Sequence, residues 1–214
     1  MNDLANLYIQ IGNFEKASHL LHNSLAIHLQ FYDETNSNSS WLLYNLGVVN
    51  GKLGNVLEGI KYLNKSYTNH LAYYHNDYVI KRDLVELANL YIDIGQYDQA
   101  ETILKQAIPE YIKHFGGAHH KVAKVYNYLA RLYLFKNQND EAMNYIRKSV
   151  AILKKEQHPE LYISYEYIAE YYLKNFNVNN ALKYIINAEK VLHKHYPSNS
   201  DLISRIQELK DKTV

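Results

Sequence analysis

The sequence predicts an all-α protein, a right-handed α-solenoid of stacked antiparallel helix pairs. Three observations lead to this prediction. Small residues recur at nearly constant intervals along the 214 residues. Apolar residues surround them at three- and four-residue spacing, which is typical of helices. Glycines fall at regular points between these helical patterns, where a chain can turn.

The repeat is clearest in three columns of small residues. Members of the first column are 42, 41, 42 and 39 residues apart, and the other two columns follow twelve and nineteen residues later. The columns are Ala5, Gly47, Ala88, Ala130 and Ala169, then Ala17, Gly59, Ala100, Ala142 and Ala181, and then Ser24, Ser66, Ala107, Ser149 and Ala188. Small residues allow two helices to approach closely. The sequence therefore predicts five copies of one helix pair.

A turn is expected seven residues after the first column. Gly12, Gly54 and Gly95 occupy this position in the first three repeats, and glycine adopts the left-handed conformation that ends a helix at little cost. Asn137 and Phe176 replace glycine in the last two repeats. Asparagine tolerates this conformation and phenylalanine does not, so we expect the fifth turn to be built differently.

The helices follow from these patterns in chain order. We expect them at about 1–11 and 14–31, 40–53 and 56–75, 78–94 and 97–115, 120–136 and 139–156, and 159–175 and 178–196. The repeats then span about 1–36, 37–76, 77–117, 118–157 and 158–197 of a single domain, followed by a capping helix at 199–212.

Pro159 suits a helix start. Pro109 falls inside a helix and predicts a kink or break near residues 105–109.

The two ends of the array differ. Leu202, Ile203, Ile206 and Leu209 share one face of the last helix, which is how a solenoid end is covered. The first helix is short, so part of an apolar face at the start is expected to be uncovered. This leaves two alternatives, a start trimmed from a longer protein or a homo-oligomer contact through the short N-terminal helix.

The repeats resemble the tetratricopeptide repeat family, in its kinesin-light-chain-like subtype. The resemblance rests on LANLYIQIGNFEKA at 4–17 and LANLYIDIGQYDQA at 87–100, and on the junctions FGGAHHKVAKVYNYLA at 115–130 and EQHPELYISYEYIA at 156–169. It implies that the first helix of each pair lines a concave face that receives extended peptides or helices. It also implies a structural or capping role for the junction histidine at 119 or 120.

A candidate peptide-binding groove follows from this implication. Its residues are Asn6, Arg82, Asn89, Lys124, Asn127 and Arg131. Arginine can bind a carboxylate with two hydrogen bonds, and asparagine can bind a peptide backbone as donor and acceptor. The fifth repeat is acidic at Glu166 and Glu170. We therefore expect a protein or extended peptide partner with an acidic segment over repeats three and four.

Composition argues against several other partners. Lys plus Arg total 23 and Asp plus Glu total 22, so the basic excess typical of nucleic-acid binders is missing. No apolar stretch approaches the ~20 residues that cross a bilayer. Cysteine is absent and no secretory signal begins the chain, so we expect a cytoplasmic protein.

Catalytic and cofactor chemistry is not indicated. His119 and His120 are adjacent, but a zinc site needs three or four convergent ligands. GVVNGKLGN at 47–55 has the wrong spacing for a phosphate-binding loop. No nucleophile with a base and an orienting group stands out, so we expect no enzyme, no metal and no cofactor.

The sequence thus predicts a non-catalytic scaffold that binds a protein or peptide. Two alternatives are a peptide-sensing regulatory region and a sensor fragment of a larger multidomain protein. A third is a self-assembling structural element.

Overall fold

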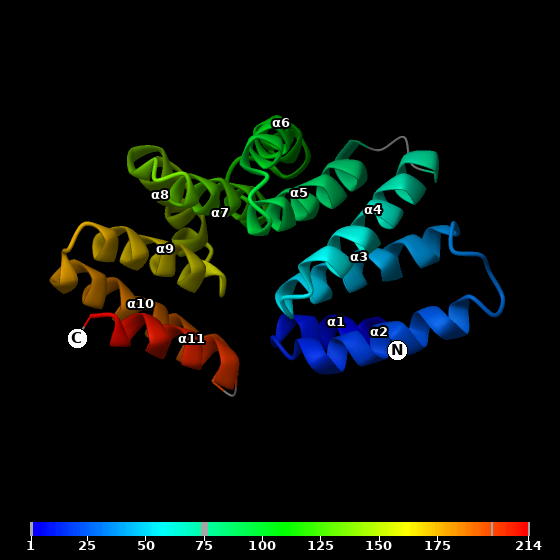
Figure 1. Cartoon of the computed structure of the whole chain (residues 1–214), viewed down its shortest axis with the longest axis horizontal. Coiled ribbons are helices and arrows are strands. Elements are labelled where there is room, and N and C mark those ends of the chain that lie inside the picture. Colours follow the sequence, from blue (N-terminus) through cyan, green and yellow to red (C-terminus); the bar gives the residue numbers. More distant parts are fainter. Residues whose placement is uncertain (1, 74–76, 198, 214) are drawn as a thin grey trace. The chain divides into compact units, whose positions relative to one another are not determined.

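Eleven helices make up the regular structure of the described part of the chain. The computed structural model describes residues 2–73, 77–197 and 199–213. The helices are α1 (Asn2–Gln10), α2 (Phe14–His28), α3 (Ser37–Lys52), α4 (Val56–Tyr73), α5 (Asp77–Asp93), α6 (Tyr97–Phe115), α7 (His120–Phe135), α8 (Asn139–Lys155), α9 (Leu161–Lys174), α10 (Val178–His195) and α11 (Ser200–Asp211). Each begins and ends within three residues of the predicted bounds. The prediction of an all-α solenoid of helix pairs is confirmed (Figure 1).

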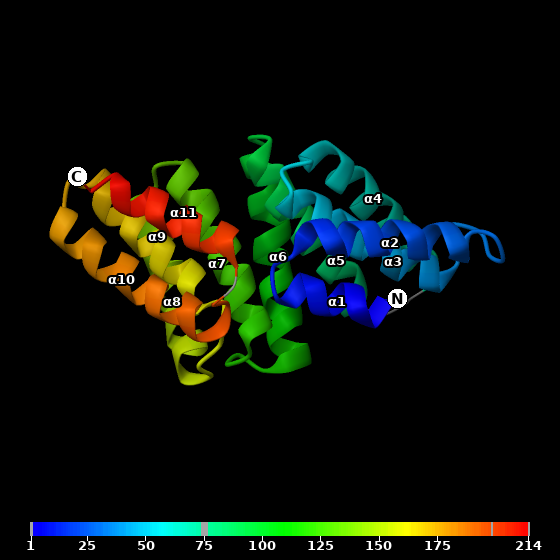
Figure 2. The same ribbon diagram turned by 90° about the horizontal axis from the view of Figure 1, so that it is seen from below.

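Neighbouring helices in the chain pack against each other. The pairs α1–α2, α3–α4, α7–α8 and α9–α10 are in contact, and α2, α4 and α8 also contact the first helix of the following pair (Figure 2). The chain forms two compact units, residues 1–110 and 111–214. The division falls inside α6. The single continuous domain expected from the sequence stays a prediction.

Small residues bring the paired helices together. Ala5, Ala17, Ala88, Ala130 and Ala142 have no exposed surface. Between α3 and α4, a Cβ added at Gly59 would lie 2.9 Å from the carbonyl oxygen of Gly47. These two backbones are therefore too close for any side chain at Gly59. Large aliphatic residues fill the remaining space, including Leu43 and Leu46 in the first unit and Leu129, Ile146 and Ile185 in the second.

The five turns inside the pairs have one conformation. Gly12, Gly54, Gly95, Asn137 and Phe176 all have positive φ, between 54° and 80°. In each turn this residue donates its N–H to the carbonyl three residues earlier, and the next residue donates to the carbonyl five residues earlier. Both bonds satisfy carbonyls at the helix end.

The prediction of a different fifth turn is therefore wrong. Phe176 has φ 54°, and its N–H bonds Leu173 at 3.0 Å. The N–H of Asn177 bonds Tyr172 at 2.9 Å, as the corresponding residue does in the other turns. The Phe176 side chain is 93% exposed, so it meets no neighbour. The two hydrogen bonds and the packed helices hold the backbone against a strain of about 1–2 kcal/mol.

The sequence predicted a kink or a break near Pro109, and no break occurs there, while a kink stays a prediction. Helix α6 continues from Tyr97 to Phe115 with Pro109 inside it. The proline removes one backbone hydrogen bond. Leu104, Ala107 and Tyr111 are buried on either side of it, so packing on both sides keeps the helix continuous.

Helix α11 covers the end of the second unit. Ile206 and Leu209 are buried in a cluster with Ile185 and Leu192 of α10. The side chain of Asn199 accepts the N–H of Leu202 at 3.0 Å and caps the helix start. The apolar face expected in this helix is present.

Candidate binding face

The candidate binding face is the side of the first helices that carries the predicted groove residues. In the first unit these helices are α1, α3 and α5, and α3 contacts α5 directly. Asn45 of α3 donates its side-chain amide to the Asn6 oxygen of α1 at 3.2 Å. Asn6 is exposed and Asn89 of α5 is half-buried.

Arg82 has a different environment from the one its sequence position suggested. Its guanidinium carbon lies 3.9 Å from the centre of the Trp41 ring and 3.8 Å from that of Tyr44. Its Nε and Nη2 atoms donate to Asp83 Oδ1 at 3.2 and 2.9 Å. The side chain is only 9% exposed. Arg82 therefore joins α3 to α5, and both of these hydrogen bonds stay within the fold.

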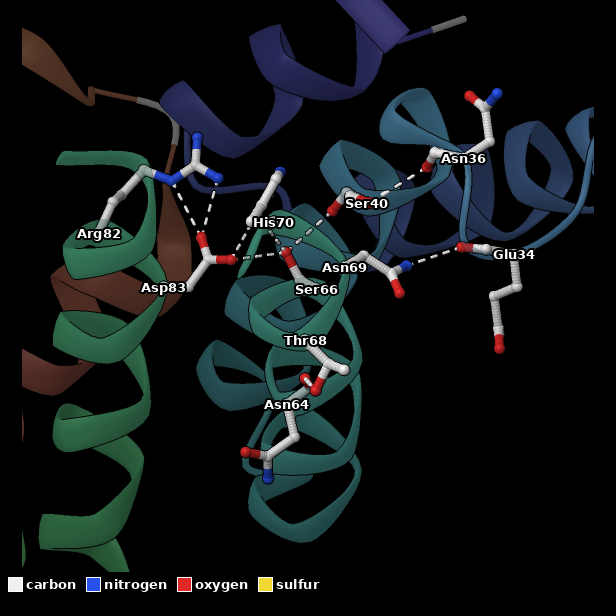
Figure 3. A network of polar contacts seen from close by, with 10 residues as sticks. All are labelled: Glu34, Asn36, Ser40, Asn64, Ser66, Thr68, Asn69, His70, Arg82 and Asp83. Atoms are coloured by element: carbon white, nitrogen blue, oxygen red, sulfur yellow. Dashed lines mark hydrogen bonds and ion pairs between the residues drawn. The ribbon is translucent and has the colours of Figure 1, made fainter. Parts of the chain in front are cut away.

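Asp83 is the centre of a buried polar network in the first unit. Its second oxygen, Oδ2, lies 2.6 Å from His70 Nδ1 and accepts the Ser66 hydroxyl at 2.9 Å. The Ser66 hydroxyl also lies 3.0 Å from the carbonyl oxygen of Ser40. Figure 3 shows these side chains meeting between α3, α4 and α5. The network connects three helices through one carboxylate.

Ser66, His70 and Asp83 are the residue types of a hydrolytic triad, but their arrangement differs from one. In a triad the carboxylate bonds one imidazole nitrogen and the serine bonds the other. Here Asp83 Oδ2 bonds both Ser66 and His70 Nδ1. All three side chains have no exposed surface, so no substrate reaches them. The network is a structural feature.

Asn127 occupies the interior of the second unit. It is 3% exposed, and its oxygen accepts the Ser164 hydroxyl of α9 at 2.9 Å. The Ser164 oxygen lies 3.0 Å from that of Ser149 on α8. Like Asp83, Asn127 therefore connects neighbouring helices, and its amide is turned away from solvent.

Lys124 and Arg131 are half-buried on α7. The Lys124 amine lies 5.7 Å from the Tyr128 ring centre, and the Arg131 guanidinium lies 5.4 Å from that of Phe135, which is exposed. Arg131 therefore places a cation beside an exposed aromatic ring on the candidate face.

The acidic residues of the fifth repeat are surrounded by cations. Glu166 is buried and its Oε2 lies 3.0 Å from Arg205 of α11. Burial raises the pKa of Glu170, while Arg205, Lys174, Lys212 and Arg131 act in the opposite direction. Helix α11 thus brings positive charge to the stretch that the sequence alone marks as acidic.

The candidate residues divide between the two units. Asn6, Arg82 and Asn89 belong to residues 1–110, and Lys124, Asn127 and Arg131 belong to residues 111–214. A continuous patch formed by all six stays a prediction.

Two further expectations concern metals and membranes. No three His, Asp or Glu side chains gather in a metal-binding arrangement within residues 2–73, 77–197 and 199–213. His119, His120 and His158 instead stack on one another, with ring centres 4.1 and 4.4 Å apart. None of the helices in the described residues combines the length and apolar character needed to span a bilayer.

Sequence reasoning missed the Asp83 network and Arg205. The repeat columns contained one signal for the network. Ser66 and Ser149 share a column, and Asp83 and Ser164 share another, five residues before Ala88 and Ala169. Polar residues in both columns bond each other in the structure. Arg205 had no such signal, because α11 lies outside the repeat.

The fold defines an all-α helical-repeat protein. The tetratricopeptide repeat family matches residues 1–76 and 84–155, and the chain belongs to this family. Its fold is of the kinesin-light-chain-like type. None of the curated protein sequences matches the chain.

Solved structures with this fold come from several proteins. A putative kinesin light chain of Podosopora anserina with nearly identical TPR-like repeats has a TM-score of 0.61 and 23% identity, over 92% of this chain and 95% of the other. A Rap protein complexed with Competence and Sporulation Factor has a TM-score of 0.78 and 14% identity, over 99% and 63%. Aspartyl phosphate phosphatase F of Bacillus subtilis has a TM-score of 0.70 and 12% identity, over 96% and 53%. At these identities the likeness shows the fold alone.

Proposed function

We propose that this protein is a non-catalytic scaffold that binds a protein or an extended peptide on the candidate binding face. The supporting observation is the cation-rich surface of the second unit. Arg131 of α7, Lys174 of α9, Arg205 of α11 and Lys212, which directly follows α11, all favour the charged form of one carboxylate, that of Glu170. Positive charge from different parts of the second unit therefore acts at one acidic residue.

The partner that fits this region carries carboxylates. Glu166 is paired with Arg205, and Glu170 is the acidic group whose charged form all four cations favour. Exposed Phe135 lies beside Arg131 and offers an apolar contact. We propose a peptide with acidic residues next to an apolar one, since charge complementarity favours such a partner. The groove proposed from the sequence is thereby extended to α11.

A binding experiment tests this function. The probe is a fluorescein-labelled peptide with an apolar residue between aspartates, and the matched probe has lysines in place of the aspartates. Wild type should bind the acidic peptide more tightly. Arg131→Ala and Lys124→Glu should weaken binding by about 1–3 kcal/mol, the value of a lost charged hydrogen bond. Lys183→Ala, an exposed lysine of α10, is the control that should leave affinity unchanged. Unchanged affinity in both face variants would show that the face is wrongly assigned.

A peptide-sensing regulatory role is the second candidate. It is favoured by the fold shared with the Rap protein complexed with Competence and Sporulation Factor, over 99% of this chain. This support is an analogy of fold. A sensor would change conformation on binding, so the amide exchange of α7 and α9 with and without the acidic peptide distinguishes it from a rigid scaffold.

A further inference from the structure

Two histidines form matching hydrogen bonds at helix starts in the second unit. His119 Nδ1 accepts the N–H of Lys121 at 3.2 Å at the start of α7. His158 Nδ1 accepts the N–H of Glu160 at 3.2 Å at the entry to α9. Each bond satisfies a backbone donor that has no partner inside the helix. We call these two bonds the histidine caps.

The two histidines occupy equivalent positions in the repeat. Each lies eleven residues before the first small residue of its repeat, Ala130 or Ala169. In the second repeat the equivalent residue is Asn36, whose side-chain oxygen accepts the N–H of Asn38 at 3.0 Å at the start of α3. The same cap is thus made by a side chain that does not titrate in the first unit, and by imidazoles in the second.

A column of rings connects the two caps. The His120 ring lies between His119 and His158, with ring centres 4.1 and 4.4 Å apart. Phe115 stacks on the other side of His119 at 4.6 Å. The loop that precedes α7 and the loop that precedes α9 are therefore held together by stacked rings, and three of the four rings are imidazoles.

Protonation is incompatible with these contacts. An imidazole nitrogen accepts a hydrogen bond only while it carries no proton. Neutral His119 and His158 therefore carry their proton on Nε2, and the next proton must go to Nδ1, which accepts the backbone N–H. Two donors would then face each other and the cap would be lost. The added charge would also lie at a helix N-terminus, where cations are unfavourable.

We propose that the column of Phe115, His119, His120 and His158 is a pH-sensitive joint, which caps the starts of α7 and α9 at neutral pH and releases both when its histidines are protonated. This proposal is independent of partner binding.

Charged groups around the column both favour and oppose protonation of its histidines. Glu156 lies 3.4 Å from His120 Nδ1, and Glu160 also favours the charged form of His120. Lys121, whose amine lies 4.6 Å from the Phe115 ring centre, opposes protonation, as do the neighbouring imidazoles. His114 makes an edge contact with the Phe115 ring, with ring centres 4.5 Å apart. Burial is the largest effect, and it lowers the pKa of both His119 and His120.

The sign of the pH dependence follows from these directions. The folded pKa of His119 and His120 lies below the ordinary value near 6.5. The unfolded chain then binds more protons than the folded one in acid. Stability is therefore complete above about pH 6.5 and is lost progressively as the pH falls through the lower, folded pKa.

Asparagine at both caps is the matched variant, because Asn36 shows that asparagine makes this cap. Thermal unfolding of the full chain is measured at pH 7.5 and 5.5 for wild type, for His119→Asn with His158→Asn, and for His193→Asn, an exposed histidine of α10. Wild type and His193→Asn should lose more Tm than the double variant, by about 4–8 °C for each cap that is released in a unit of this size. Equal losses in all three proteins would overturn the proposal.

If the double variant does not fold, a second measurement on wild type tests whether the two caps are released in acid. At pH 7.5, ¹⁵N NMR of the imidazoles should show unprotonated Nδ1 in His119 and His158. Amide exchange corrected for its intrinsic pH dependence should show protection at Lys121 and Glu160 falling roughly fivefold at pH 5.5, while that of Asn38 is unchanged. A proton on Nδ1 at pH 7.5, or unchanged protection at Lys121 and Glu160, would also overturn the proposal.

Discussion

At the scale of single residues, several polar side chains of the first helices hold helices together. Arg82 is stacked between Trp41 and Tyr44 and paired with Asp83. Asn127 bonds Ser164 inside the second unit. From their position on a helix alone, these residues are expected to line the groove and contact a ligand. Both are buried, so a charged or amide side chain on this face can instead hold neighbouring helices together.

Asp83→Asn should destabilise the first unit. The substitution removes the charge that compensates Arg82 and leaves the His70 contact without its carboxylate. Breaking a buried ion pair on one side costs about 3–5 kcal/mol, so the free energy of unfolding in urea should fall by about that amount. Glu58→Gln removes an exposed pair with Lys61 and should cost less than ~1 kcal/mol. Similar losses for both variants would contradict a structural role for the network.

Phe176→Gly should stabilise the second unit. The substitution relieves a left-handed strain of about 1–2 kcal/mol, and the unfolded chain regains ~0.5–1 kcal/mol of entropy with glycine. The exposed ring contributes no packing. A net gain of about 0.5–1 kcal/mol is expected in chemical denaturation. The reverse change at the equivalent turn, Gly95→Phe, should destabilise, and a loss of stability in Phe176→Gly would show that the ring has a role in the fold.

At the scale of helices, α1 leaves part of its apolar face exposed. Leu4 and Leu7 are 45% and 51% exposed. The residues at the same places in the fourth repeat, Leu129 and Leu132, are 0% exposed. In later repeats the second helix of a pair contacts the first helix of the next pair, as α2 contacts α3 and α8 contacts α9. The apolar face of α1 is therefore the surface on which the proposal of self-association depends.

A matched pair of substitutions tests this face. Leu7→Lys should change the free energy of unfolding by less than ~0.5 kcal/mol, as surface substitutions usually do. Leu132→Lys buries an unpaired charge and should prevent stable folding. Light scattering over a range of concentrations then examines wild type and Leu7→Lys. A mass that rises with concentration in wild type and not in the variant supports self-association, and a wild type that stays monomeric at high concentration counts against it.

At the scale of the whole molecule, stability is expected to be local. Helices contact their neighbours in the chain, so stability in such arrays is a sum of nearest-neighbour terms. Ile206 and Leu209 of α11 complete the apolar cluster at one end. Arg205 of the same helix neutralises Glu166. Helix α11 thus contributes both to packing and to the charge of the candidate face.

Removal of residues 199–214 should destabilise the second unit and leave the first unchanged. The loss of Ile206 and Leu209 is worth about 3–6 kcal/mol, from ~1.5–3 kcal/mol for each buried aliphatic side chain. Amide exchange should show lower protection in α9 and α10, with the protection of α3 and α4 as the internal control. An equal loss of protection in both units would show that the chain unfolds as one cooperative body.

The sequence by itself determined the repeat, the helix bounds and the turns, because these depend on residues close together in the chain. Glycine and asparagine at the turns act through their own φ, and small residues act on the adjacent helix. The turn at Phe176 and the continuity of α6 through Pro109 were misjudged because packing of whole helices outweighed a local cost. Only the tertiary structure showed that Arg82 and Asn127 bond to neighbouring helices inside the fold. It also showed that Arg205 pairs with Glu166 of the fifth repeat, and that the His120 ring lies between those of His119 and His158. The partners of these side chains come from other helices or loops, and no local pattern specifies which residues face each other across such an interface.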